Sequence, residues 1–353
     1  MVRLLVLPVR PGRVLRLFSL ALLCTALGCS SAPATAVAAQ MPPPVEVIPS
    51  PATAPALPAT ADVMAAVFLP HDPRPGYPVT VAATRGFGIE TASLMSGGRR
   101  LSGGTFFPVT CDEGRDFLAT VLTVPTTAAA GSAEIVLAAA GEPVMWLPLE
   151  IAPREFRSET IRMNNAMAGI QADQSAERTA QAQHLWAVLG RVGDETHFFG
   201  GFVRPVVSTR RTSIFGSRRV FVNANGTSST SIHAGIDYGV PTGTPVFASG
   251  AGRVVLARDR IVSGRSVIIE HLPGVFSIYY HLDSIGVSEG DMIAAGAVLG
   301  LSGSTGFSTG PHLHWEVRVF GENTDPDALV ARPLLDKNAL SAKLEDGAVA
   351  NAP

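Results

Sequence analysis

The sequence predicts an all-β protein in which two β domains are joined by a short helical segment. Short apolar alternations separated by Gly- and Pro-rich turns extend over residues 62–152 and favour strands. Residues 158–192 are rich in Gln, Glu, Ala and Arg, with apolar residues at loosely helical spacing. From about residue 200, β-branched runs alternate with glycine turns, which again indicates strands. The 353 residues have room for two domains plus connecting and targeting segments.

The N-terminus has the pattern of a secretory signal. Four arginines, the last of them Arg16, precede the apolar run 17–27, which is too short for an ordinary membrane span. The run ends in Gly28-Cys29-Ser30, which resembles the cleavage site of bacterial lipoproteins, although Ala26 replaces the usual leucine. Lipidation of Cys29 would attach the protein to a membrane. The alternative is ordinary cleavage near Ala38, which leaves a single thiol at Cys111.

The next segments predict a tether and a small domain. Residues 30–61 are mostly Ala, Pro, Ser, Thr and Val, which bury little surface and behave as a semi-extended linker. The strand region 62–152 matches an immunoglobulin-like β-sandwich in size and turn frequency. His71 and Cys111 are isolated within it, so we expect a positioning or substrate-binding domain without a site of its own. A connecting helix is expected to end near Gly190.

The charge balance argues against nucleic acid as a partner. The chain has 27 Lys+Arg against 29 Asp+Glu, and the positive residues are nearly all arginine. A nucleic-acid-binding face would instead show a broad excess of basic residues.

Two short motifs in the second β domain contain imidazole and carboxylate groups that can bind a metal ion. The first is His233-Ala-Gly235-Ile-Asp237, in which an imidazole and a carboxylate offer the donors that zinc accepts in catalytic sites. The second is His312-Leu-His314, which follows the glycine-rich loop 302–310. Strand alternation puts both histidines on one face, about 6 to 7 Å apart. Because unpartnered buried imidazoles are costly, a shared site is a better explanation than two separate core histidines.

A third histidine is less certain from the residues alone. His281 follows Tyr279-Tyr280 near the end of an expected strand, while His271 lies a few residues earlier. Composition and spacing do not choose between them.

The order of these motifs resembles the M23 family of zinc peptidases, of the lysostaphin and LytM type. The resemblance covers about residues 205–330 and includes further matching pieces at 212–218, 243–246, 290–291 and 303–306. It favours His281 over His271. The chain departs from the family pattern mainly at 262–266, which affects the expected shape of a loop. The resemblance implies an antiparallel β-sheet sandwich that forms a groove.

The resemblance also implies the roles of the site residues. His233, Asp237 and His314 would bind one Zn²⁺, and His281 and His312 would be catalytic histidines beside the metal-bound water. Three protein ligands leave a position for water, as in catalytic zinc sites. We expect His312 to accept the proton of this water and His281 to stabilise the oxyanion, although the two roles are interchangeable at this level.

The expected function is therefore zinc-dependent hydrolysis of peptide cross-links in bacterial peptidoglycan, of the D-alanyl to diaminopimelate type. The expected location is the periplasm or cell envelope. Two alternatives remain: a non-catalytic wall-binding or amidase-activating module, and an exported peptidase that acts on proteins. The complete ligand set argues against the first, and the lack of a His-Glu-x-x-His motif argues against the second. The expected segments are a signal (1–29), a linker (30–61), a β-sandwich (62–152), a helical linker (153–199), the M23-type zinc peptidase domain (200–335) and a C-terminal tail (336–353).

Overall fold

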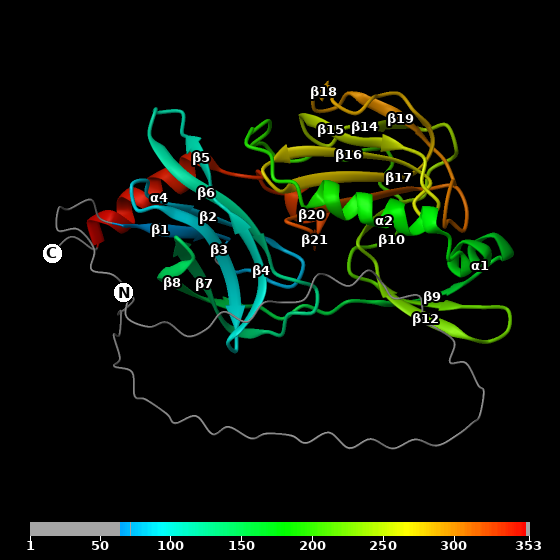
Figure 1. Ribbon diagram of the computed structural model, residues 1–353, viewed down its shortest axis with the longest axis horizontal. Helices are drawn as coiled ribbons and strands as arrows, with labels where there is room; N and C mark the ends of the chain where they lie inside the picture. Colours follow the sequence, from blue (N-terminus) through cyan, green and yellow to red (C-terminus); the bar gives the residue numbers. More distant parts are fainter. Residues whose placement is uncertain (1–63, 71, 351–353) are drawn as a thin grey trace, which may run out of the picture. The chain divides into compact units, whose positions relative to one another are not determined.

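A computed structural model describes residues 64–70 and 72–350 (Figure 1). The predicted signal, Cys29, the tether and His71 lie outside these residues. Within the described ranges, none of the helices combines the length and apolar character needed to span a membrane.

The first part of the described chain is built from two antiparallel four-stranded sheets. Buried side chains from both sheets form one core, which includes Val81, Leu94 and Leu137. In β7, Ile135 and Leu137 alternate with less buried neighbours, as the period of two requires. The strands confirm the all-β prediction, while the immunoglobulin-like architecture stays a prediction. The strand order of the first sheet is β1 (Ala66–Leu69), β2 (Pro78–Ala83), β6 (Asp116–Thr123), β5 (Phe107–Thr110). The strand order of the second sheet is β4 (Arg99–Thr105), β3 (Ile89–Ser96), β7 (Gly131–Ala139), β8 (Glu142–Ile151).

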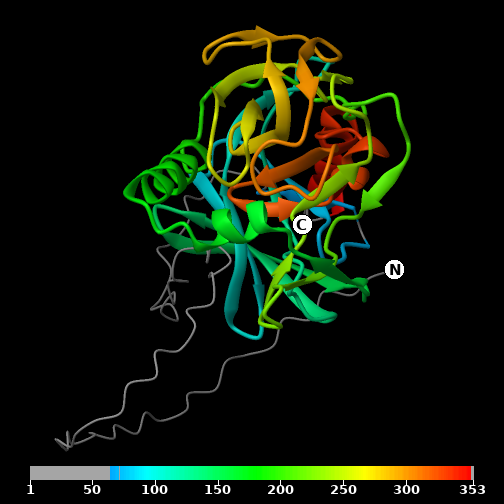
Figure 2. The same cartoon turned by 90° about the vertical axis from the view of Figure 1, so that its right-hand side faces the viewer.

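The connecting segment contains two helices, α1 (Asn165–Ala172) and α2 (Ala176–Leu189). The side chains of Asn164 and Ser175 accept hydrogen bonds from the first turn of each helix, which supplies the N-caps. Gly190 caps the end of α2, near the predicted terminus. The apolar face of α2 covers strands of the second domain through Leu185, Val188 and Leu189 (Figure 1, Figure 2).

A short strand, β9 (Ser158–Arg162), precedes these helices and differs from the purely helical linker that the sequence predicts. It pairs in parallel with β11 (Arg218–Val222), which also pairs with β12 (Ser228–Ile232) in a three-stranded sheet. The partner of β9 is about sixty residues further along the chain, so its local sequence carries little sign of the pairing.

The second β domain is organised around a ten-stranded antiparallel sheet. Its central strand β20 is buried throughout, with Leu313, Trp315 and Val317 in the hydrophobic core and the alternate residues on the other face. The main strand order is β10 (Arg211–Ser213), β13 (Gly235–Tyr238), β20 (Leu313–Val319), β17 (Val275–Ile285), β16 (Arg265–Leu272), β15 (Gly252–Arg258), β18 (Met292–Ile293). Three more strands branch from this order: β19 (Val298–Ser302) pairs with β17, β14 (Pro245–Phe247) pairs with β19, and β21 (Glu322–Thr324) pairs with β20.

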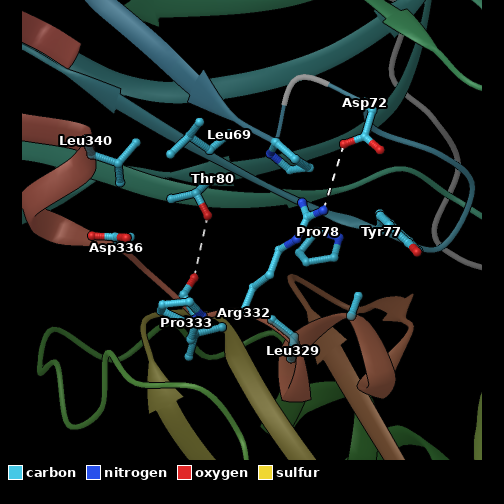
Figure 3. A pocket seen from close by; sticks show the side chains of 13 residues that line it. Leu69, Asp72, Tyr77, Pro78, Thr80, Leu329, Arg332, Pro333, Asp336 and Leu340 are labelled. Carbon is cyan, nitrogen blue, oxygen red and sulfur yellow. Dashed lines mark hydrogen bonds and ion pairs between the residues drawn. The ribbon is translucent and has the colours of Figure 1, made fainter.

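The predicted tail, residues 336–353, contains a helix. After α3 (Pro326–Val330), α4 (Lys337–Ala350) packs near β1 and buries Leu340 and Leu344. A cavity of about 450 Å³ lies beside this contact, and Leu69, Thr80 and Leu340 are among its lining residues (Figure 3). The Thr80 hydroxyl donates to the Leu334 carbonyl across it, at 3.5 Å.

Replacing Trp315 by alanine is expected to lower the free energy of unfolding by about 3 to 5 kcal/mol, because its fully buried ring lies beneath the centre of the sheet. Denaturant unfolding of the metal-free protein measures this loss. Trp146, which is 49% exposed, provides the matched control: its replacement by alanine is expected to lower the free energy of unfolding by less than about 1 kcal/mol. Equal losses for the two variants would contradict the packing assigned to Trp315.

Candidate metal centre

Three side chains meet at the pairing of β13 with β20. His233 Nε2 lies 3.1 Å from Asp237 Oδ1 and 3.1 Å from His314 Nδ1, and the last two atoms are 2.8 Å apart. All three residues are buried. Gly235 is needed here, because a Cβ would lie 2.1 Å from the Trp315 carbonyl oxygen on the neighbouring strand.

The hydrogen bonds behind each imidazole fix which ring nitrogen carries the proton. His233 Nδ1 donates to the Ile214 carbonyl at 2.9 Å, so its Nε2 has a free lone pair. His314 Nε2 donates to Glu316 Oε2 at 3.3 Å, so its Nδ1 has a free lone pair. Two nitrogen lone pairs and one carboxylate oxygen therefore converge on one point. Such a donor set repels itself unless a cation or a proton lies between the atoms, and it matches the ligands of catalytic zinc.

The ionisation of these groups reflects the same arrangement. Burial alone would raise the pKa of Asp237, but His233 and His314 hold it well below its usual range. Burial lowers the pKa of His233. For His314, burial acts in the same direction, but hydrogen bonds with Asp237 and Glu316 raise its pKa to about 9. In the metal-free protein, a proton on His314 thus balances the aspartate charge, and a metal ion would take its place.

The groups behind the cluster are themselves paired. Arg219 forms an ion pair with Asp237 Oδ2, which leaves Oδ1 for the cluster. Burial would raise the pKa of Glu316, but Arg318 and His314 lower it to about 2, so it stays a carboxylate. Tyr280 stacks on the His314 ring, with centroids 5.6 Å apart, and holds its plane.

Two further histidines flank the cluster. His281 Nδ1 lies 2.7 Å from the Thr305 carbonyl, and His312 Nδ1 lies 2.8 Å from the Gly310 carbonyl, so each Nε2 is an acceptor. His312 Nε2 is 3.8 Å from Asp237 Oδ1, and the two flanking rings are 4.7 Å apart. Burial and the neighbouring His312 lower the pKa of His281 to about 3, so it is neutral near pH 7.

His281 has an unusual backbone conformation, with φ at 63°. A residue with a side chain rarely adopts this region, and its presence is typical of functional sites. The backbone N–H of His281 donates to the Ser263 carbonyl at 2.9 Å, which holds the conformation.

The cluster opens into a groove formed by two adjoining cavities of about 260 and 290 Å³. Both cavities are lined by Arg219, Phe221, His281, Phe307 and His314. The lining includes apolar residues of the connecting segment and residues of the loop before β20. The connecting segment contributes Ile161, Met167 and Ile170.

The structure brings together His233, Asp237, His314, His281 and His312, the five residues that the sequence indicates. It places His271 elsewhere: this ring is buried, with Nδ1 2.7 Å from the Ala251 carbonyl and Nε2 2.8 Å from the Ser277 hydroxyl. The sequence analysis missed four neighbouring groups. Glu316 and Tyr280 lie inside the motifs, and alternation could have placed Glu316 beside His314, whereas Arg219 and Glu159 gave no local signal.

The antiparallel sheet and the cluster of two histidines and one aspartate, flanked by two more histidines, define a domain of the metallopeptidase class. Residues 231–326 match the family model described as peptidase family M23, so the chain contains an M23 peptidase domain. This confirms the resemblance inferred from the motifs.

Relatives agree with this assignment. The DD-carboxypeptidase/endopeptidase Mpg of Neisseria meningitidis is 41% identical over 128 residues, which cover 36% of this chain and 29% of the relative. The peptidoglycan DD-endopeptidase ShyA of Vibrio cholerae is 45% identical over 89 residues, which cover 25% of this chain and 21% of the relative. The chain thus spans less than a third of the length of these relatives.

A solved structure extends the comparison to the fold. The crystal structure of a Pseudomonas aeruginosa protein, described as an M23 peptidase, covers 73% of this chain and 94% of its own, with a TM-score of 0.52. At 24% sequence identity, this similarity concerns the fold alone.

Because His271 is buried, we expect the free energy of unfolding to depend on pH through a group that lies outside the candidate metal centre. Burial lowers its pKa to about 4 in the folded protein, against 6.5 for an exposed histidine, so the unfolded chain binds the proton first. Its contribution is therefore complete above pH 6.5 and is lost as the pH falls towards 4, by about 3 kcal/mol at the limit.

Urea unfolding of the metal-free protein across this pH range measures the effect, with His271→Asn as the comparison. The variant is expected to show a smaller loss of stability on acidification. Parallel curves for the two proteins would mean that His271 does not stay neutral in the folded state.

Proposed function

We propose that the protein is a zinc-dependent endopeptidase that hydrolyses peptide cross-links in bacterial peptidoglycan. The observation that carries the proposal is the cluster of two imidazole nitrogens and one carboxylate oxygen, which opens to a groove and is flanked by His281 and His312. The names of the relatives from Neisseria meningitidis and Vibrio cholerae, which refer to carboxypeptidase and DD-endopeptidase activities, support the substrate class.

In this proposal His233 Nε2, Asp237 Oδ1 and His314 Nδ1 bind one zinc ion. Bound zinc supplies Lewis acidity, which polarises a peptide carbonyl and makes water nucleophilic near neutral pH. Two neutral imidazoles and one carboxylate leave the centre with a net positive charge. The ion pair between Asp237 Oδ2 and Arg219 keeps the carboxylate oriented with Oδ1 towards the cluster.

His312 is the proposed general base. Its Nε2 faces the cluster as an acceptor, and the bond from Nδ1 to the Gly310 carbonyl fixes that tautomer. After it accepts the proton of the attacking water, His312 is a donor that can protonate the leaving amine. His281 is neutral and is held by the Thr305 carbonyl, so it positions water or substrate through Nε2. Stabilisation of an oxyanion by His281 requires that it first gains a proton.

The finer assignments are part of the same proposal. The bond is the D-alanyl to diaminopimelate cross-link, a choice favoured by the DD-endopeptidase names of several relatives. Action on peptidoglycan places the protein in the periplasm or cell envelope, with membrane attachment through a lipidated Cys29. Residues 62–152 are the sandwich domain, and 200–335 are the catalytic domain.

Digestion of isolated cross-linked peptidoglycan by the full chain tests the activity. Muropeptide analysis by mass spectrometry is expected to show loss of dimers and a matching rise of monomers, and to identify the bond. His312→Ala is expected to retain zinc but to lower the rate by about 100-fold or more, because it removes the base. His184→Ala, on α2, is the matched histidine control and is expected to cleave at the wild-type rate.

An unchanged muropeptide pattern with zinc fully bound would reject the proposal. In that case a wall-binding or amidase-activating role, or a protein substrate, would explain the site.

Removal of one ligand tests the metal centre separately. Asp237→Ala is expected to lose stoichiometric zinc, because two imidazoles remain and Arg219 places an unpaired positive charge beside them. Elemental analysis after dialysis measures the zinc content. Asp194→Ala removes an exposed carboxylate and is expected to keep one zinc per chain. Full zinc occupancy in the Asp237 variant would show that the ion binds elsewhere.

A further inference from the structure

The strand β9, which lies outside the residues matched by the family model, brings a carboxylate to the back of the metal centre. Glu159 lies directly opposite Arg219 in the parallel pairing of β9 with β11. Side chains at paired positions project from the same face of a sheet. Here Arg219 Nε is 3.6 Å from Glu159 Oε2.

The same carboxylate accepts hydrogen bonds from two buried serines. Ser213 Oγ is 2.7 Å from Glu159 Oε2 and 3.0 Å from Oε1, and Ser217 Oγ is 2.7 Å from Oε1. Ser213 Oγ is also 3.0 Å from His233 Nδ1. Glu159 therefore reaches His233 through one hydroxyl and Asp237 through one guanidinium.

We propose that Glu159 is a positioning residue for the metal centre, acting on His233 through Ser213 and on Asp237 through Arg219. This inference rests on the proposed metal-binding role of the cluster.

The serine route follows from the direction of the hydrogen bonds. An ionised carboxylate only accepts, so the single proton of the Ser213 hydroxyl is donated to Glu159. The hydroxyl then has only lone pairs to offer His233, so it accepts from the same Nδ1–H that donates to the Ile214 carbonyl. That tautomer leaves Nε2 unprotonated towards the metal position. Without the carboxylate, the hydroxyl is free to turn away from this position, and only the Ile214 carbonyl then orients the imidazole.

The guanidinium route concerns the orientation of the aspartate. Arg219 holds Asp237 Oδ2, and Glu159 supplies a negative group on the other side of the guanidinium. The side chains of both Arg219 and Asp237 are at most 15% exposed, so solvent screens these charges weakly. Outer groups of this kind commonly change metal affinity by about 10- to 100-fold when they are mutated.

The test measures zinc affinity of the full chain by competition with a chromophoric chelator. Glu159→Gln, which keeps size but removes charge, is expected to weaken zinc binding by about 10-fold or more. Glu155→Gln removes an exposed carboxylate three residues before β9 and is expected to bind zinc like the wild type. Wild-type affinity in the Glu159 variant, or equal weakening in both variants, would overturn the proposal.

Two readouts separate positioning from a general loss of structure. In the metal-free protein, ¹⁵N chemical shifts of the His233 ring are expected to show protonated Nδ1 in both proteins, because the Ile214 carbonyl fixes this tautomer. The Nδ1 shift is expected to move in Glu159→Gln, because the Ser213 hydroxyl is no longer held beside it. The effect of Glu159→Gln on zinc affinity is also expected to be smaller in a Ser213→Ala background, because the shared hydroxyl is then absent. Unchanged His233 shifts or full additivity would overturn the proposal.

These outcomes are independent of the proposed activity. Wild-type protein that binds zinc but leaves peptidoglycan intact would reject the endopeptidase function and leave the role of Glu159 standing. Wild-type protein that cleaves peptidoglycan, together with unchanged zinc affinity in Glu159→Gln, would support the endopeptidase function and reject the role of Glu159.

Discussion

The register between β13 and β20 is the constraint on which the metal centre depends. Asp237 lies directly opposite His314 in this antiparallel pairing, so two of the three donors are set by backbone hydrogen bonds. A slip of one residue would turn every side chain of β20 to the opposite face and would bury His314 in the core. The apolar residues of the same strand, with Trp315 among them, prevent this slip because they must face the core. The register that packs the apolar side chains of β20 into the core is therefore the same register that brings Asp237 and His314 together.

The buried charges around this register are stable because each of them has a partner. A single buried carboxylate would be costly, but Asp237 meets Arg219, and Glu316 meets Arg318. His314 lies between the two acids and accepts a proton easily when no metal is present. Arg318 also lies over the ring of Trp186 from α2, with 5.1 Å to the centroid, so the connecting helix contacts this network.

The sequence predicted the parts of the site that follow from local order along the chain. His312 and His314 are two residues apart at the start of β20, and His233 and Asp237 are four residues apart at the neighbouring strand β13. The choice of His281 over His271 needed the family resemblance, because both lie in apolar strand contexts. The structure shows the physical difference. His281 has a positive φ and reaches the cluster, whereas His271 is held in the core by Ala251 and Ser277.

The parts that sequence analysis missed depend on contacts between distant segments. The strand β9 has five residues and gains its hydrogen bonds from β11, so neither composition nor periodicity reports it. The helix α4 lies in the predicted tail, and its position depends on burying Leu340 and Leu344. Arg219 and Glu159 likewise become neighbours only through this pairing.

The connecting segment therefore has more than one physical role. Through Ile161 and Met167 it forms part of the groove wall, and Met167 is almost fully buried there. Through Glu159 it also contacts Arg219 and Ser213 behind the cluster. Residues 153–199 are predicted to be a helical linker, but removing them would take Ile161 and Met167 from the groove lining and Glu159 from behind His233. A fragment that begins at residue 200 would therefore lack part of the groove lining and also the carboxylate that we propose positions the metal-binding side chains.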